Sequence, residues 1–149
     1  MLVSTWYSYR VFLYIYSMKF LAIVLCCLFF ISCKESVTKL TEKITGADSL
    51  AINYFKGDGT MDSVIAVKII ADKNKINQLA KLAGGHTTKN SNCGFDGSLH
   101  FFKNNQVIQD IQFRMNDTEC AHFSFKLEGK LYSTELPDEA KALLQSLKK

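Results

Sequence analysis

The sequence has little proline, little glycine and no long run of charge of one sign. One proline and eight glycines among 149 residues exclude a collagen-like or proline-rich polymer. The formal net charge is +4, and the basic and acidic residues are interspersed along the chain. Because proteins that bind nucleic acid concentrate positive charge on one surface, we expect no nucleic-acid partner.

The common motifs of enzymes are missing as well. The chain contains no nucleophile elbow, phosphate-binding loop, zinc-hydrolase pair or dinucleotide fingerprint. Residues 57–62 have the composition of a calcium loop but lack its spaced oxygens and its final Glu, so we interpret them as a turn. We therefore expect a protein that is not an enzyme and that holds no metal or cofactor.

Apolar residues are concentrated near the amino terminus. Lys19 precedes twelve uncharged apolar residues, Phe20–Ile31, and Ser32 and Cys33 follow them. A positive head, a short apolar stretch and a small residue at the cleavage site form the pattern of a secretory signal peptide. A membrane-spanning helix needs about 20 apolar residues, and Lys19 interrupts the longer stretch 11–31. The pattern favours a signal peptide over a transmembrane helix.

The six residues Leu28-Phe29-Phe30-Ile31-Ser32-Cys33 resemble the lipobox of bacterial lipoproteins. In that family the Cys thiol receives a diacylglycerol, the preceding peptide is removed, and the new amino group is acylated. Phe30 stands where the family usually has Leu. The resemblance implies lipidation of Cys33; the alternative is a buried Cys at the end of a signal or membrane helix. Since two or more acyl chains hold a protein stably, a lipidated Cys33 would be a permanent anchor.

The resemblance divides the chain into four parts. Residues 1–17 have no place in it and are interpreted as an upstream extension that is not native, 18–32 as the signal peptide, 33–47 as a lipidated polar tether, and 48–149 as a single domain. The segments 93–102 and 120–123 also resemble domains of small envelope lipoproteins, which implies no particular activity.

The residues after the lipobox bear on sorting. Lys34-Glu35 lacks the Asp that retains lipoproteins at the inner membrane in the best-known sorting rule. A basic residue followed by an acidic one also resembles the surface-export signals of some lipoproteins. The resemblance therefore implies an outer-membrane anchor, on the periplasmic side or at the cell surface.

The predicted processing reduces the number of cysteines that can form a disulfide. Of five cysteines, Cys26 and Cys27 leave with the signal peptide, Cys33 takes the lipid, and Cys93 and Cys120 remain. A pair in an oxidising compartment favours a disulfide. Closing a loop of about 28 residues would stabilise the fold by about 3–4 kcal/mol.

Two alternatives to the disulfide stay open, namely free thiols and a metal site. Cys93, His100, Cys120 and His122 are all side chains that zinc accepts. Structural zinc sites use ligands in close pairs, and only Cys120 and His122 are close in sequence. The spacing therefore favours the disulfide.

Periodicity in the remaining chain predicts an α+β domain. Residues 50–55 and 64–70 indicate a hairpin. The second strand has apolar residues at both odd and even positions, which point to opposite faces of a sheet, so we expect it to be central and covered by a helix on at least one face. Asp72 is the expected N-cap of a helix that ends at Gly84-Gly85.

Further strands are expected at 98–103, at 107–115 after a turn at Asn104-Asn105, and at 122–127, the last continuing through 130–133. A final helix is expected to begin at Pro137. The predicted order is ββαββββα. We expect an antiparallel sheet of about five to six strands with two helices packed on one face.

The three histidines are the candidate acid or base groups. His86 lies in a polar loop, whereas His100 and His122 lie on predicted strands with the parity of the solvated face. Together with Ser124 and the loop 86–97, His100 and His122 are predicted to line a recognition patch. Exposed apolar neighbours would strengthen this hypothesis, because contiguous apolar area marks binding surfaces; the candidates are Phe102, Ile108 and Tyr132.

These features point to a lipid-anchored envelope protein that binds another envelope protein or an envelope polymer without catalysis. The alternative is a periplasmic enzyme or metal-handling protein that uses Cys93, Cys120 and the histidines. A structural accessory subunit without a ligand is a third interpretation.

Overall fold

The computed structural model describes residues 35–56, 63–89 and 93–149 of the chain. The predicted extension, the signal peptide, Cys33, Lys34 and the predicted turn at 57–62 lie outside these residues. No helix among the described residues is long and apolar enough to cross a membrane.

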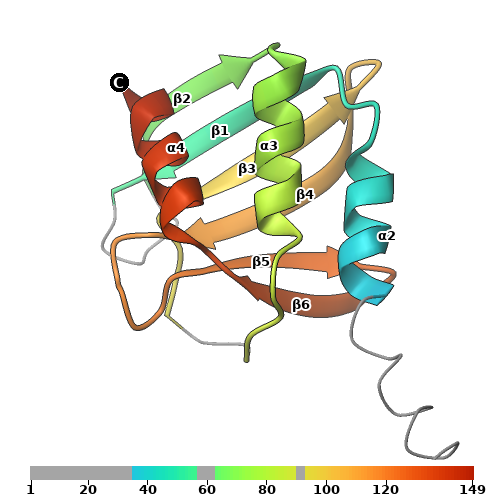
Figure 1. Cartoon of the computed structure of the whole chain (residues 1–149). Helices are drawn as coiled ribbons and strands as arrows, with labels where there is room; N and C mark the ends of the chain where they lie inside the picture. The colour runs from blue at the N-terminus through green and yellow to red at the C-terminus, as the bar shows by residue number, and fades with distance from the viewer. Residues whose placement is uncertain (1–34, 57–62, 90–92) are drawn as a thin grey trace, which may run out of the picture. The chain divides into compact units, whose positions relative to one another are not determined.

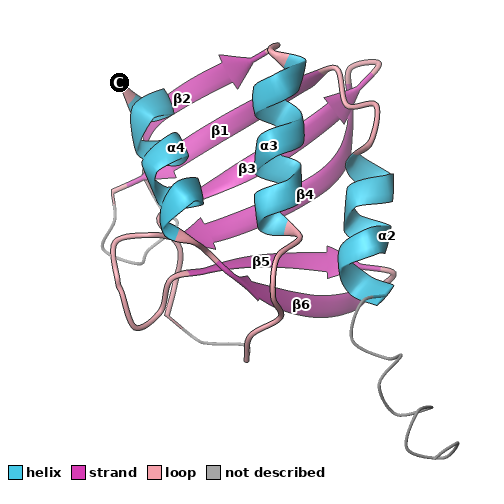
Figure 2. Cartoon of the chain, in the orientation of Figure 1, coloured by secondary structure: helices cyan, strands magenta, loops and turns pink. Residues whose placement is uncertain are grey.

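Six strands form one antiparallel sheet in the order β2-β1-β3-β4-β5-β6, and the described helices lie across one of its faces (Figures 1 and 2). The predicted α+β class with an antiparallel sheet is confirmed. In chain order the elements are α2 (Glu35–Ile44), β1 (Ser49–Phe55), β2 (Val64–Ile70), α3 (Lys73–Ala83), β3 (Gly97–Lys103), β4 (Gln106–Arg114), β5 (His122–Leu127), β6 (Lys130–Glu135) and α4 (Asp138–Lys148).

The helix α2 corrects the prediction of two helices and the order ββαββββα. It lies within the segment 33–47 that the sequence predicted to be a polar tether, and Leu40 and Ile44 are buried in the core. Two apolar residues four positions apart suffice to mark one helical face. The surrounding Lys, Thr and Glu side chains conceal this short stripe in the sequence. The described order is αββαββββα.

The core lies between the sheet and the helices. Tyr54, Phe101, Phe113 and Phe123 are fully buried on the sheet face that the helices cover. The Tyr54 hydroxyl donates to the carbonyl oxygen of Leu144 in α4 at 2.7 Å, and its ring meets Phe113 edge-on with 6.0 Å between centroids. Burial raises the pKa of Tyr54 to about 12, because the low-dielectric core disfavours the phenolate.

The predicted turn at Asn104-Asn105 and the predicted helix cap at Asp72 are confirmed. Asn104 and Asn105 have positive φ values of 51° and 62° between β3 and β4, as a tight hairpin requires. Asp72 caps α3 by accepting from Asn74 N at 2.9 Å. The hairpin of β1 and β2 is also antiparallel, as predicted.

The prediction that the second strand is central is wrong, although Ala66 and Ile70 pack against the core on the face that the helices cover. β2 is an edge strand, paired with β1 alone. Val64, Ile65, Val67 and Ile69 are between 52% and 69% exposed. Continuous apolar residues are typical of strands buried on both faces, but here they belong to a bare edge.

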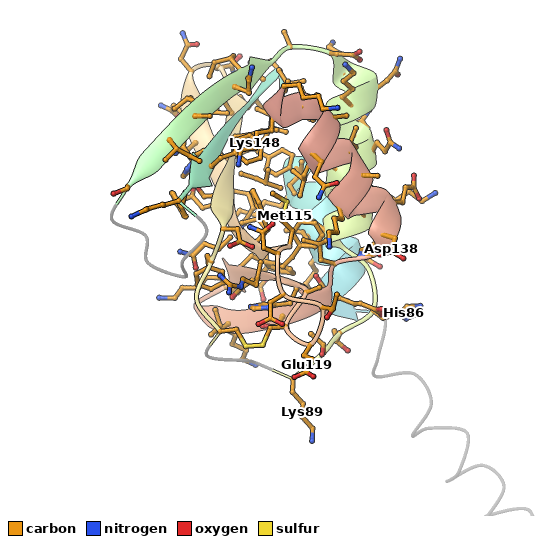
Figure 3. All side chains as sticks on the ribbon, turned by 90° about the vertical axis from the view of Figure 1, so that its left-hand side faces the viewer. His86, Lys89, Met115, Glu119, Asp138 and Lys148 are labelled. Carbon is orange, nitrogen blue, oxygen red and sulfur yellow. A yellow bond between two sulfur atoms is a disulfide. The ribbon has the colours of Figure 1, made fainter. Side chains whose placement is uncertain are left out.

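The opposite edge of the sheet is covered. Residues 86–88 run along β6, where Thr88 N donates to Ser133 O at 2.9 Å and Glu135 N donates to His86 O at 2.8 Å. Beyond this contact the described chain resumes at Cys93. A disulfide joins Cys93 to Cys120, with 6.2 Å between the Cα atoms (Figure 3, yellow bond). The predicted disulfide is confirmed, and the Cα separation lies in the usual range for a bridge.

Candidate functional site

The candidate site lies on the sheet face opposite the helices, which we call the open face. Side chains alternate between the two faces along each strand, so the register decides which polar residues meet. Asn53 pairs with Ser98, Ser98 with Gln112, and Gln112 with Ser124. These residues form a polar row across β1, β3, β4 and β5.

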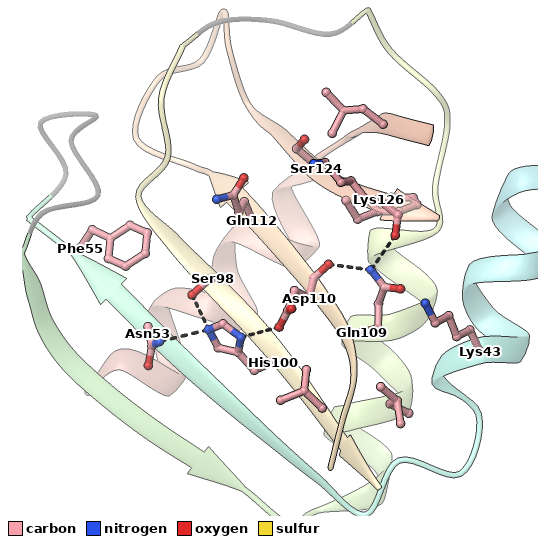
Figure 4. Close-up of a pocket in the computed structure, with 14 residues that line it drawn as sticks. Lys43, Asn53, Phe55, Ser98, His100, Gln109, Asp110, Gln112, Ser124 and Lys126 are labelled. Carbon is pink, nitrogen blue, oxygen red and sulfur yellow. Dashed lines mark hydrogen bonds and ion pairs between the residues drawn. The ribbon is translucent and has the colours of Figure 1, made fainter. Parts of the chain in front are cut away.

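The open face is hollowed around this row. The hollow has a volume of about 740 Å³ and is shown in Figure 4. Its lining combines amide, hydroxyl, imidazole and charged groups with a few apolar side chains, and consists of Lys43, Asn53, Phe55, Ser98, His100, Val107, Ile108, Gln109, Asp110, Gln112, Ser124, Phe125, Lys126 and Leu131.

His100 is the centre of a hydrogen-bonded cluster in the hollow. Its Nε2 lies 3.1 Å from Asn53 Nδ2 and 2.8 Å from Ser98 Oγ, and its Nδ1 lies 2.6 Å from Asp110 Oδ1. An amide nitrogen can only donate, so Nε2 acts as the acceptor and the ring proton resides on Nδ1. The Nδ1–H group then donates to the Asp110 carboxylate. Asp110 is 65% exposed, so this carboxylate is also open to a ligand.

The strands β4 and β5 separate at one end of the hollow. They pair only from Ile111 to Arg114 on β4. Beyond that point the side chain of Gln109 spans the gap, because its Nε2 donates to Asp110 O at 2.7 Å and to Lys126 O at 3.2 Å. The Gln109 Oε1 atom is buried and accepts no hydrogen bond from the described residues. Lys43 extends toward it from α2 (Figure 4).

Apolar side chains border the polar row. Val107 on β4 and Leu131 on β6 are 49% and 50% exposed, and Ile108 is half-buried beside them. Exposed apolar groups beside convergent polar groups are typical of small-ligand sites. Ile108 thus lies where the sequence placed a supporting apolar neighbour, whereas Tyr132 stacks on Phe125 at 5.9 Å between ring centroids.

The structure brings two of the three predicted patch residues into the hollow. His100 and Ser124 both line it. His122 does not, because it is only 2% exposed, with its Nδ1 2.6 Å from Cys120 O and its ring 5.6 Å from that of Phe95. His122 occupies a position of β5 whose side chain points to the open face, but the loop before β3 covers this end of the face.

Asp96 holds that loop in place, and no pattern in the sequence indicated its importance. It is 1% exposed and accepts from Arg114 Nη1 at 2.9 Å and from the main-chain N–H groups of Met115 and Asn116, both at 2.8 Å. An Asp beside Gly97 in a polar loop is typical of a turn, so only the fold distinguishes this residue.

A metal-handling role finds no ligand set in the part of the chain that the structure describes. Cys93 and Cys120 are joined to each other, and no group of three or more His, Cys, Asp or Glu side chains is placed to hold an ion there. His86 is exposed in the segment that runs along β6 (Figure 3).

The cluster resembles a nucleophilic triad in its distances but not in its surroundings. Ser98 Oγ, His100 and Asp110 are hydrogen-bonded in the order that activates a serine. Ser98 is nevertheless buried, and β3 pairs with a strand on each side. The main-chain N–H groups around Ser98 are thereby engaged in the sheet and do not form an oxyanion hole. The arrangement suits binding better than acyl transfer.

Comparison with known proteins does not extend this description. The chain matches no protein-family model, and no curated protein or solved structure is significantly similar to it. The lipobox that resembles that of bacterial lipoproteins ends at Cys33 and lies outside the described part. The open face therefore carries the functional interpretation by its own geometry.

Proposed function

We propose that this chain is a lipid-anchored envelope protein whose open face binds another envelope component. The observation that carries the proposal is the hollow of about 740 Å³ over the polar row. A ligand-sized depression with convergent polar groups and apolar borders is the usual form of a binding site.

The anchor in this proposal is Cys33. In the sequence, Lys34 alone separates Cys33 from the first residue of α2. Lipidation would hold the domain close to the membrane, and the localisation would be the outer membrane, facing either the periplasm or the cell surface.

The anchor is tested with Cys33→Ala in cells fed an alkyne-labelled fatty acid. The wild-type chain should incorporate the label and begin at Cys33, whereas the variant should incorporate none. A labelled variant, or a wild-type chain whose mass includes Met1, would refute the anchor.

The binding face is tested by photo-crosslinking in intact cells. A photoreactive residue replaces Val107 at the border of the hollow, and a matched one replaces Asn77, which is exposed on α3 on the other side of the sheet. We expect a defined crosslinked product from position 107 and none from position 77. No product at 107, or the same product at both positions, would refute an open-face binding function.

A serine hydrolase is the second candidate function, because the Ser98–His100–Asp110 distances favour it. A fluorophosphonate probe labels activated serines. Labelling of the wild-type chain that is lost in Ser98→Ala would replace the binding proposal with catalysis, whereas equal lack of labelling in both would support binding.

A further inference from the structure

We infer that the hollow on the open face binds a saccharide, that is, an uncharged ligand rich in hydroxyl groups such as a short stretch of an envelope polysaccharide. The inference rests on the proposed binding function and names its ligand class. It follows from the charges, the hydrogen-bonding groups and the apolar borders of the hollow.

Charges of both signs around the hollow favour a neutral ligand. The exposed Asp110 carboxylate would repel an anion, and Lys43 and Lys126 would repel a cation. A phosphate or carboxylate ligand has only acceptors, so it would offer the exposed Asp110 carboxylate no hydrogen bond.

The polar groups that a ligand can reach include donors and acceptors side by side. Asn53 and Gln112 carry amides, His100 and Asp110 form a donor–acceptor pair, and all four line the same hollow. A sugar hydroxyl both donates and accepts, so neighbouring hydroxyls can match such a mixed set. An apolar ligand would displace water from these groups without replacing the lost hydrogen bonds.

The apolar borders of the hollow match the C–H groups of a sugar ring. The C–H groups of a pyranose ring give it an apolar face, and Val107 and Leu131 offer exposed apolar surface at the side of the polar row. The volume of about 740 Å³ lies within the usual range for small-ligand sites. It suits a few sugar units better than a protein domain.

An extended peptide fits this position less well. Peptides that bind sheets add a strand at an edge and use unpaired main-chain groups. The polar row instead crosses four strands in the interior of the sheet, where the register pairs each residue with its neighbours. Recognition here must use side chains, which suits hydroxyl groups.

The test is binding of the full lipidated chain in detergent to a printed array of neutral glycans, with oligogalacturonate and a serine-rich octapeptide as the anionic and peptide probes. Asp110→Asn is the main variant, because an exposed side chain can change without unfolding the domain. Asn53→Ala is the second, and Asn77→Ala on α3 is the matched control. Circular dichroism verifies the fold of each.

We expect binding of at least one neutral glycan, weakened about tenfold or more by Asp110→Asn and by Asn53→Ala and unchanged by Asn77→Ala. The saccharide inference would be overturned if no glycan on the array bound, or if glycan binding were the same in the wild type and both site variants. It would also be overturned if the anionic or peptide probe alone bound in a way that depended on the site residues. Crosslinking from position 107 decides the binding function separately, so the two failures are distinguishable.

Discussion

The two edges of the sheet differ in whether another segment of the chain covers them. Residues 86–88 bond to β6, and the disulfide joins Cys93, at the start of the next described segment, to Cys120. The β2 edge has no such cover and exposes apolar side chains instead. Bare edges are a liability for association, so the fold protects one side of the open face with chain and covalent bonds and leaves the other accessible.

The difference also shows where stability should come from. At the β6 side, the main-chain bonds of residues 86–88 and the disulfide fasten the chain, and Asp96 fixes the residues before β3 to the end of β4. At the β2 end, β1 and α4 supply the support from within the core through Tyr54 and Leu144. Loss of polar or covalent bonds near the covered edge should therefore lower the free energy of unfolding, whereas substitutions of exposed side chains on the bare edge should hardly change it.

Asp96→Ala should have the largest effect on stability. It would leave the Arg114 guanidinium, whose side chain is only 14% exposed, and two main-chain N–H groups without their acceptor. Removing one member of a buried ion pair costs about 3–5 kcal/mol. Urea unfolding followed by circular dichroism measures the loss. A change below about 1 kcal/mol would show that Asp96 does not hold the loop.

Removing the disulfide should come next. The double variant Cys93→Ser/Cys120→Ser should lose about 3–4 kcal/mol of unfolding free energy, because the unfolded chain regains the freedom of the closed loop. Amides of residues 86–88 should exchange with deuterium faster. Reductant is the control, since it should destabilise the wild type similarly and leave the double variant unchanged.

The Tyr54 phenol should make stability fall at high pH. Its pKa is about 12 in the folded protein and about 10 when unfolded, so its contribution is complete below pH 10 and is lost as the pH rises toward 12. Two pKa units correspond to at most about 2.7 kcal/mol. Tyr54→Phe should flatten this part of the pH profile, and an unchanged slope would contradict the burial of the phenol.

Ile69→Lys should have the smallest effect on stability, within about 0.5 kcal/mol, because the side chain is 69% exposed on β2. A charge on a bare edge should slow aggregation, which light scattering on heating measures. Asn77→Lys on α3 adds the same charge away from the edge and should not slow it. Equal slowing by both would mean that net charge, and not the edge, controls association.

Local chemistry predicted most individual elements. Alternation marked β4 and β5, the Asp72 cap marked α3, and the Asn104-Asn105 turn marked a hairpin. The helix α2 escaped prediction because its buried stripe consists of few apolar residues among charged ones. Within the site, the sequence pointed to His100 and Ser124, but Asn53, Asp110 and Gln109 carried no local signal.

The sequence by itself determined most strand and helix periods and the Asn104-Asn105 turn, since each depends on neighbours along the chain. It also indicated the pair Cys93 and Cys120, because these two cysteines follow the predicted signal peptide and lipidation site. Only the tertiary structure decided that β2 is an edge, that His122 is buried, and that Asn53, His100 and Asp110 meet. These outcomes depend on which strands pair and in what register. The Asn53 and His100 contact joins residues 47 positions apart, and the free energy that sets such pairings is spread over the whole core.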